Sequence, residues 1–308
     1  MIDAPSSTWF TTAPHWQWLI VLYFFFGGLA GGSYFLAALI DLVGRREDRP
    51  LARAGYYVAF PLVMVCGLLL IVDLGRPDRF WHMMIQRNTF DVMFKSWSPM
   101  SFGSWILLAF GFFSFVSFMA ALAEDDGVRS PMLRRLQWPA FGRLRAPSVV
   151  GRVIAVLGGI AGYFLAGYTG ILLAVTNRPI WSDTPMLGML FLVSAASTSA
   201  ALLLLLAQRR GWTMAGLADL RRMDDWVIML ELLVLVAVIV SLGPVVSAWL
   251  NAWGLLLLIT IIIGMIAPLV LSWRARAFRS IDVRTAPILV LIGGFLLRAV
   301  IVLSSEAV

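Results

Sequence analysis

Long apolar stretches alternate with short polar ones along almost the whole chain. A window of about 20 residues, the length that an α-helix needs to cross a bilayer, predicts eight membrane-spanning helices. We expect helices because backbone polar groups in lipid must be satisfied within their own segment, and the alternating ten-residue strands of a β-barrel do not occur. The predicted spans are 17–43, 54–74, 99–123, 150–176, 185–207, 226–248, 252–273 and 285–304. The pattern therefore predicts an all-α, polytopic membrane protein, with residues 1–308 as a single integral membrane domain.

The basic residues in the loops predict the orientation of these helices. Eighteen of the 24 Lys and Arg residues lie in or beside the loops that follow the first, third, fifth and seventh spans. Cytoplasmic loops carry the excess of basic residues in multi-pass proteins. We therefore expect both termini on the outer, periplasmic side of a bacterial or archaeal cell (inner) membrane.

Composition agrees with a membrane protein. Hydrophobic residues make up 60% of the sequence and charged residues 13%, about half the charge of an ordinary soluble domain. The net charge of +7 follows from the loop arginines, so the lipid bilayer is the expected partner and a nucleic acid is not. The first fifteen residues contain no basic region, so we expect this segment to be retained rather than cleaved as a signal peptide.

The metal-binding residue types are too few for a redox centre. The single cysteine, Cys66, cannot hold an iron–sulfur cluster, which takes about four thiolates. The two histidines, His15 and His82, lie at or beyond the ends of apolar segments, so they do not form the facing pair that a haem between helices needs. We expect no metal, haem or iron–sulfur cluster in this protein.

Four polar residues are predicted to lie in the outer half of the membrane, on four different helices. Tyr168 lies about eight residues, or roughly 12 Å, below the outer end of its helix, and Tyr23 lies at a similar depth. Asp73 ends the second span, and Arg298 lies a turn or two below the outer end of the eighth.

Each of these residues also has a structural interpretation. The tyrosines could belong to the aromatic belt at the membrane surface, and Asp73 could form an ion pair with Arg76. An unpaired arginine in hydrocarbon costs at least about 2.5–3.5 kcal/mol, so Arg298 either reaches the surface or pairs with a carboxylate such as Asp73.

Other features of the sequence leave alternatives open. Glu231 is predicted near the inner end of span 226–248, as a helix-start carboxylate or as part of a proton path. Asp41 is expected at the surface. The aromatic and charged loop 75–98 suits either the membrane face or a docking partner. Paired glycines in spans 17–43 and 150–176 indicate close helix packing.

Five local patterns occur in order along the sequence: GGLAGGSYF (27–35), DLGRPDRFWHM (73–83), SPMSFGSW (98–105), YTGILLAVTNRPIW (168–181) and LRAVIVLSSE (297–306). Each pattern alone is weak, but together they cover nearly the whole length and fall on the predicted spans. Together they resemble the NrfD/PsrC family, the membrane subunits of polysulfide-reductase-like respiratory complexes.

The resemblance implies a quinone site near the outer face. Tyr168 matches the tyrosine that hydrogen-bonds the quinone, Asp73 the acidic residue at the end of the second helix, and Arg298 the arginine of the eighth; these three are the expected catalytic residues. Tyr23 stands where some relatives have a quinone-contacting histidine. Because of that departure, the second hydrogen-bond donor stays open, with His15 and His82 as further candidates.

Arg76, Asn177 and Arg178 complete the expected quinone-contacting set. The exchangeable substrate would be menaquinone or ubiquinone. The resemblance also implies a peripheral four-cluster iron–sulfur subunit and a molybdopterin catalytic subunit as partners, so this protein would not act on the terminal substrate alone. The alternatives are an ion or solute transporter and a passive membrane scaffold for the peripheral subunits. A charge-translocating variant, with Glu231 as the residue to probe, is also open.

Overall fold

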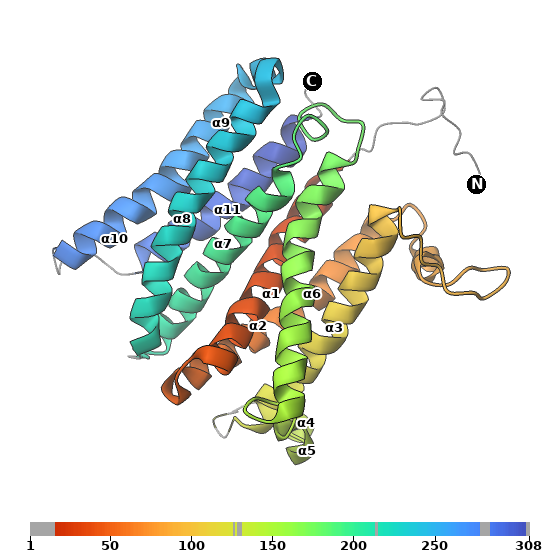
Figure 1. Ribbon diagram of the computed structural model, residues 1–308, viewed down its shortest axis with the longest axis vertical. Coiled ribbons are helices and arrows are strands. Elements are labelled where there is room, and N and C mark those ends of the chain that lie inside the picture. Colours follow the sequence, from red (N-terminus) through yellow and green to blue (C-terminus); the bar gives the residue numbers. More distant parts are fainter. Residues whose placement is uncertain (1–15, 126, 128–130, 213–214, 278–283, 306–308) are drawn as a thin grey trace.

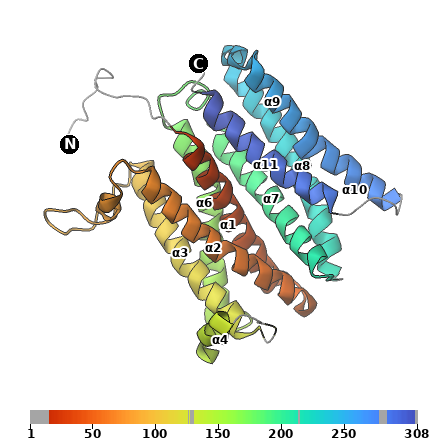
Figure 2. The same ribbon diagram turned by 180° about the vertical axis from the view of Figure 1, so that it is seen from behind.

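The computed structural model describes residues 16–125, 127, 131–212, 215–277 and 284–305, and it consists of helices joined by loops (Figures 1 and 2). Eight helices in these ranges are long and apolar enough to cross a membrane, which confirms the predicted all-α, eight-span fold. The helical segments are α1 (Trp18–Val43), α2 (Arg49–Asp73), α3 (Pro99–Ala123), α4 (Pro131–Leu136), α5 (Pro139–Gly142), α6 (Val149–Ala174), α7 (Leu187–Arg209), α8 (Ala215–Leu242), α9 (Ala252–Ile261), α10 (Ala267–Ala277) and α11 (Thr285–Ser304), with short 3-10 turns at Arg46–Asp48, Pro77–Met83 and Gly243–Trp249. A π-helical turn, Ile262–Ile266, joins α9 to α10 within one continuous span.

The spanning helices form two groups of four, and α1 joins them. Helices α1, α2, α3 and α6 make the first bundle, and α7, α8, α9–α10 and α11 make the second (Figure 1). Helix α1 packs against α7 and α11 as well as against α2 and α6. We use "outer end" for the end where α1 begins and α2 ends, and "inner end" for the opposite one.

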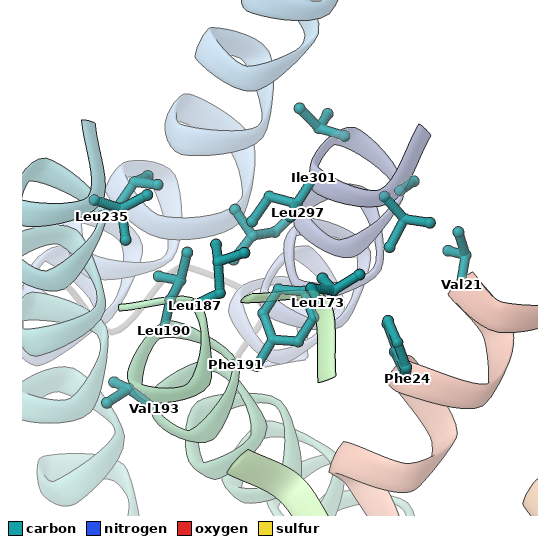
Figure 3. Close-up of a cluster of buried hydrophobic side chains, with 14 of the residues drawn as sticks. Val21, Phe24, Leu173, Leu187, Leu190, Phe191, Val193, Leu235, Leu297 and Ile301 are labelled. Carbon is teal, nitrogen blue, oxygen red and sulfur yellow. The ribbon is translucent and has the colours of Figure 1, made fainter. Parts of the chain in front are cut away.

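A large apolar cluster fills the junction between the bundles at the outer end. Side chains from α1, α6, α7, α8 and α11 contribute to it. Figure 3 shows Phe24 of α1, Leu173 of α6, Phe191 of α7 and Leu297 of α11 among the side chains of this cluster. Burial of these groups from lipid and water fixes the positions of the helices that carry the candidate site.

Close glycine contacts hold α1 against helices of both bundles, as the paired glycines predict. A Cβ placed on Gly31 of α1 would overlap the backbone of Gly162 on α6, so the two helices touch through their backbones. Gly32, on the next face of α1, lies against Ser199 of α7 in the same way. Small residues at such crossings allow the backbone approach that membrane helices use for packing.

The sixth span begins eleven residues before its predicted start. We expected it over 226–248, but α8 begins at Ala215 because Leu217 and Leu220 are buried and continue the helix through a polar stretch. Glu231 therefore lies sixteen residues into the helix and is only 4% exposed. Its interpretation as a helix-start carboxylate is wrong, since the macrodipole acts only over the first turn.

A buried ion pair closes the inner end of the first bundle. Arg145, in the loop before α6, donates to Asp41 of α1 at 2.8 and 2.9 Å and to Glu124 at 2.8 Å. The Asp41 side chain is only 1% exposed, so its expected surface position is wrong. The loop before α6 therefore holds the inner ends of α1 and α3 together through Arg145.

At the outer end, the segment between α2 and α3 projects away from the bundle (Figure 1). It contains the 3-10 turn Pro77–Met83 and a small hairpin closed by an antiparallel bridge between Ile85 and Val92. Exposed apolar side chains, including Phe90 and Trp97, lie along it.

Candidate functional site

Tyr168 lies on α6, six residues before the helix ends and so roughly 9 Å below its outer end. Its side chain is buried and packs on α3 at Gly103, where a Cβ would overlap the tyrosine ring and its hydroxyl. Gly103 lies just inside α3, which begins at Pro99 with its first turn capped by Ser98. The Tyr168 ring can occupy this position because Gly103 has no side chain.

Tyr23 of α1 lies beside Tyr168, at a similar depth. It is 2% exposed, and the two phenols are close enough to interact electrostatically. Cys66 of α2 packs against the same turn of α1, with its Sγ 3.8 Å from the Tyr23 carbonyl oxygen. All four helices of the first bundle therefore meet around the two tyrosines. The depth argument places Tyr23 and Tyr168 at one level, but it expects Arg298 of the eighth span beside them, where the structure has Gly103 of α3.

The two hydroxyls lack the hydrogen bonds that buried tyrosines usually make. In the described part of the sequence, neither the Tyr23 nor the Tyr168 hydroxyl has a hydrogen-bond partner. Tyr34, buried deeper in the same bundle, bonds Ser117 at 2.7 Å and donates to the Ile154 carbonyl at 3.1 Å. Since buried tyrosine hydroxyls normally find partners, Tyr23 and Tyr168 have donor capacity left for another molecule.

Asp73 lies above this pair, at the end of α2. It follows Cys66 by seven residues, which puts it on the same face of the helix and roughly 10 Å nearer the outer surface. Asp73 and Arg76 are both exposed, and the structure contains no ion pair between them. The interpretation of this pair as a structural ion pair is therefore wrong.

Arg298 belongs to the second bundle and not to the neighbourhood of Asp73. It is 1% exposed, and its Nη1 donates to Gly294 O at 2.8 Å and to Ser194 Oγ at 3.1 Å. Its carboxylate neighbour is Glu231 of α8. The expected pairing of Arg298 with Asp73 is wrong because α11 packs against α1, α7 and the α9–α10 span, whereas α2 lies elsewhere in the first bundle.

The backbone leaves α6 through a short loop that folds back on the bundles. Asn177 is exposed and Arg178 is half-buried in this loop. Trp181 is fully buried: it stacks on Trp16 with ring centroids 5.3 Å apart, and its Nε1 donates to Ile301 O at 2.7 Å. The loop is therefore anchored between α1 and α11.

Two histidines, His82 and His15, are the other candidates for the second hydrogen-bond donor. The His82 ring lies tilted against that of Trp81 in the 3-10 turn after α2, and its Nε2 is buried without a partner among the described residues. His15 lies outside the described residues. In those residues, no group of three or more His, Cys, Asp or Glu side chains lies together.

Sequence reasoning missed the part played by Gly103. Its signal was present, because the glycine falls inside the SPMSFGSW pattern at the outer end of α3. The pattern did not reveal its contact with Tyr168, since that contact depends on how α3 and α6 are rotated about their axes.

The fold and this site define a class: a multi-pass protein of the inner membrane with a buried tyrosine pair near one end of a four-helix bundle. The family model "Polysulphide reductase, NrfD" matches residues 10–308, and the chain therefore belongs to the NrfD family of respiratory reductase membrane subunits.

Individual relatives agree with this assignment. The sequence is 25% identical, over 64% of its length, to a selenate reductase subunit of Mesobacillus selenatarsenatis, of which 48% is covered. It is 29% identical, over 59% of its length, to a polysulfide reductase subunit of Wolinella succinogenes, of which 55% is covered. Protein NrfD of Escherichia coli is 28% identical over 74% of this sequence and 71% of its own. The protein thus spans about half the length of the first two relatives.

Proposed function

We propose that this protein is the quinone-reactive membrane subunit of a respiratory oxidoreductase, with its quinone site at the outer end of the first bundle. The observation that carries the proposal is the pair of hydroxyls on two buried tyrosines, Tyr23 and Tyr168, that have no hydrogen-bond partner among the described residues. A quinone is a flat, apolar ring with two carbonyl oxygens, so it needs apolar walls and a few directed donors. Family membership supports the same chemistry.

The two tyrosines bind and orient the ring. Tyr168, held by its contact with Gly103, donates to one carbonyl oxygen, and Tyr23 is the nearest second donor. Neighbouring apolar groups, such as Leu172, exclude water from the ring. A quinone takes up two electrons and two protons on reduction to the quinol.

Asp73 holds or releases protons at the mouth of the site. It lies between the tyrosine level and the outer surface, where a carboxylate can exchange protons with water. Arg76, Asn177 and Arg178 are on the loops that flank this mouth, so we assign them to the headgroup's entry path. Arg298 has no contact there and takes no part in this step.

Electrons reach or leave the quinone through a partner. The partner is a peripheral iron–sulfur subunit docked at the outer end, itself bound to a molybdopterin catalytic subunit. Two relatives are named as components of a selenate reductase and of a polysulfide reductase, which supports such an assembly. The projecting loop between α2 and α3, with its exposed aromatic residues, is the surface we assign to that docking.

Replacement of Tyr168 by Phe tests the site in the purified protein. The variant removes one hydroxyl and keeps the ring, so the dissociation constant for a short-chain quinone should rise about three- to tenfold, the cost of one neutral hydrogen bond. Binding is measured in lipid nanodiscs by quenching of tryptophan fluorescence.

Tyr34→Phe is the matched control. It removes a hydroxyl that already has two protein partners, so it should lower thermal stability and leave quinone affinity unchanged. Equal affinity in wild type and Tyr168→Phe contradicts the proposal. Solute flux through liposomes that contain this protein alone, without saturable quinone binding, would favour a transporter.

A further inference from the structure

Two charged residues of the second bundle, Glu231 and Arg298, are almost completely buried, and Arg298 also meets α1 at Gly28. Glu231 lies roughly 24 Å along α8 from its start and roughly 16 Å from its end. Arg298 of α11 is its charged neighbour. Ionisable side chains at such depth are costly, and they mark functional pathways more often than structural ones.

Ser194 of α7 connects the two charged residues. Its hydroxyl accepts a hydrogen bond from Arg298 Nη1 at 3.1 Å and lies close to the carboxyl group of Glu231. No direct contact within salt-bridge distance joins Glu231 to Arg298, although both are described. The carboxyl group therefore interacts with the guanidinium across a hydroxyl rather than being locked to it.

The Arg298 guanidinium has other partners besides the neighbouring carboxylate. Two backbone carbonyls, of Gly294 and Phe191, accept from its nitrogens at 2.8 and 3.4 Å. It also lies over the rings of Phe25 and Phe191, 5.8 and 5.3 Å from their centroids. Its Nε has no hydrogen-bond partner among the described residues.

A second carboxylate continues the polar line toward the inner end. Asp224 lies seven residues before Glu231, on the same face of α8, and accepts from Ser197 Oγ at 3.0 Å. Ser197 follows Ser194 by one turn, roughly 4.5 Å along α7. Facing hydroxyls and carboxylates therefore alternate along the α7–α8 contact, and Glu231 and Asp224 interact electrostatically.

We propose that Glu231 is a proton-binding site within the second bundle, filled from the inner end through Asp224 and the hydroxyls of Ser197 and Ser194. In one transfer, the Glu231 carboxylate takes the hydroxyl proton of Ser194, Ser194 regains a proton from Ser197, and Ser197 regains one from protonated Asp224. Asp224 then regains its proton from the inner surface. The groups that face Glu231 are Arg298 from α11, Ser194 from α7 and Asp224 on its own helix.

Infrared difference spectroscopy of the purified full-length protein in lipid films, perfused with buffers of two pH values, tests this proposal without any quinone turnover. The wild type should give the carbonyl band of a buried carboxylic acid that depends on pH and shifts in D2O. Glu231→Gln should lose that band. Ser194→Ala should shift its frequency without removing it, and Ser197→Ala should slow its exchange with deuterium.

Asp41→Asn is the matched control, since it alters a buried carboxylate that is directly paired with an arginine. We expect it to keep the band and to lower thermal stability.

Quinone affinity measured on Glu231→Gln reports whether the variant is folded and should equal that of the wild type. The proposal is overturned if the band persists in Glu231→Gln, or if no carboxylic acid band of the wild type responds to pH. It is also overturned if Ser194→Ala leaves the band unchanged while Glu231→Gln loses its quinone affinity, because the carboxylate is then structural.

Discussion

At the scale of single residues, two buried tyrosines of one bundle differ in whether their hydroxyls have partners within the protein. Tyr34 and Tyr168 are both buried, and each packs its ring on a glycine of a neighbouring helix, Gly158 and Gly103 respectively. The hydroxyl of Tyr34 is satisfied within the protein, whereas the described residues offer no partner to that of Tyr168. The sequence predicts the depth of both residues, but the difference between them appears only when their neighbours are known.

Gly103→Ala tests whether the contact between α3 and α6 sets the position of Tyr168. The added methyl group would overlap the tyrosine ring, so the ring must tilt away from its present orientation. Since a misplacement of about 1 Å can cost on the order of 100-fold in rate, we expect quinone-linked turnover of the whole complex to fall by at least about tenfold.

Gly111→Ala provides the comparison on the same helix. A Cβ at Gly111 would meet no atom within 4 Å, so this variant should keep normal turnover. Equal turnover in Gly103→Ala and the wild type would show that the glycine is not needed to place the ring.

At the scale of elements, the exit from α6 is a fixed loop rather than a loose connection. Helix α6 ends at Ala174, three residues before the Asn-Arg-Pro sequence. Beyond that sequence, Trp181 is buried against Trp16 and α11. Hydropathy cannot predict that the loop after α6 folds back onto the bundles, because an aromatic residue that follows a span could equally lie at the membrane interface.

Trp181→Phe should weaken this anchor. The variant keeps an aromatic ring and removes the donor to Ile301 O, which leaves a buried carbonyl unpaired at a cost of about 1–3 kcal/mol. We expect a lower thermal transition temperature in detergent. Trp226→Phe, at a side chain that is 66% exposed on α8, should have no such effect. If both variants melt together with the wild type, the loop is not anchored through this bond.

At the scale of the whole molecule, the arrangement divides the polar residues between two bundles. The eight spans, the glycine packing and the shared depth of Tyr23 and Tyr168 could be predicted, because hydropathy and helical rise fix depth in the membrane. The partners of the individual polar side chains could not be predicted, since they depend on which helices are neighbours. Arg298 has the depth for a contact in the outer half, but α11 faces α7 and α1, so its carboxylate partner is Glu231 and not Asp73.

The central claim is that quinone binds at the tyrosine pair of the first bundle. It is tested most directly by photo-crosslinking a short-chain azidoquinone to the purified protein in nanodiscs and mapping the labelled peptides by mass spectrometry. We predict labelling of α6 around Tyr168 and of α3 around Gly103, prevented by excess unlabelled quinone. Competed labelling confined to α8 and α11 around Arg298, or labelling that excess quinone does not prevent, would contradict the account.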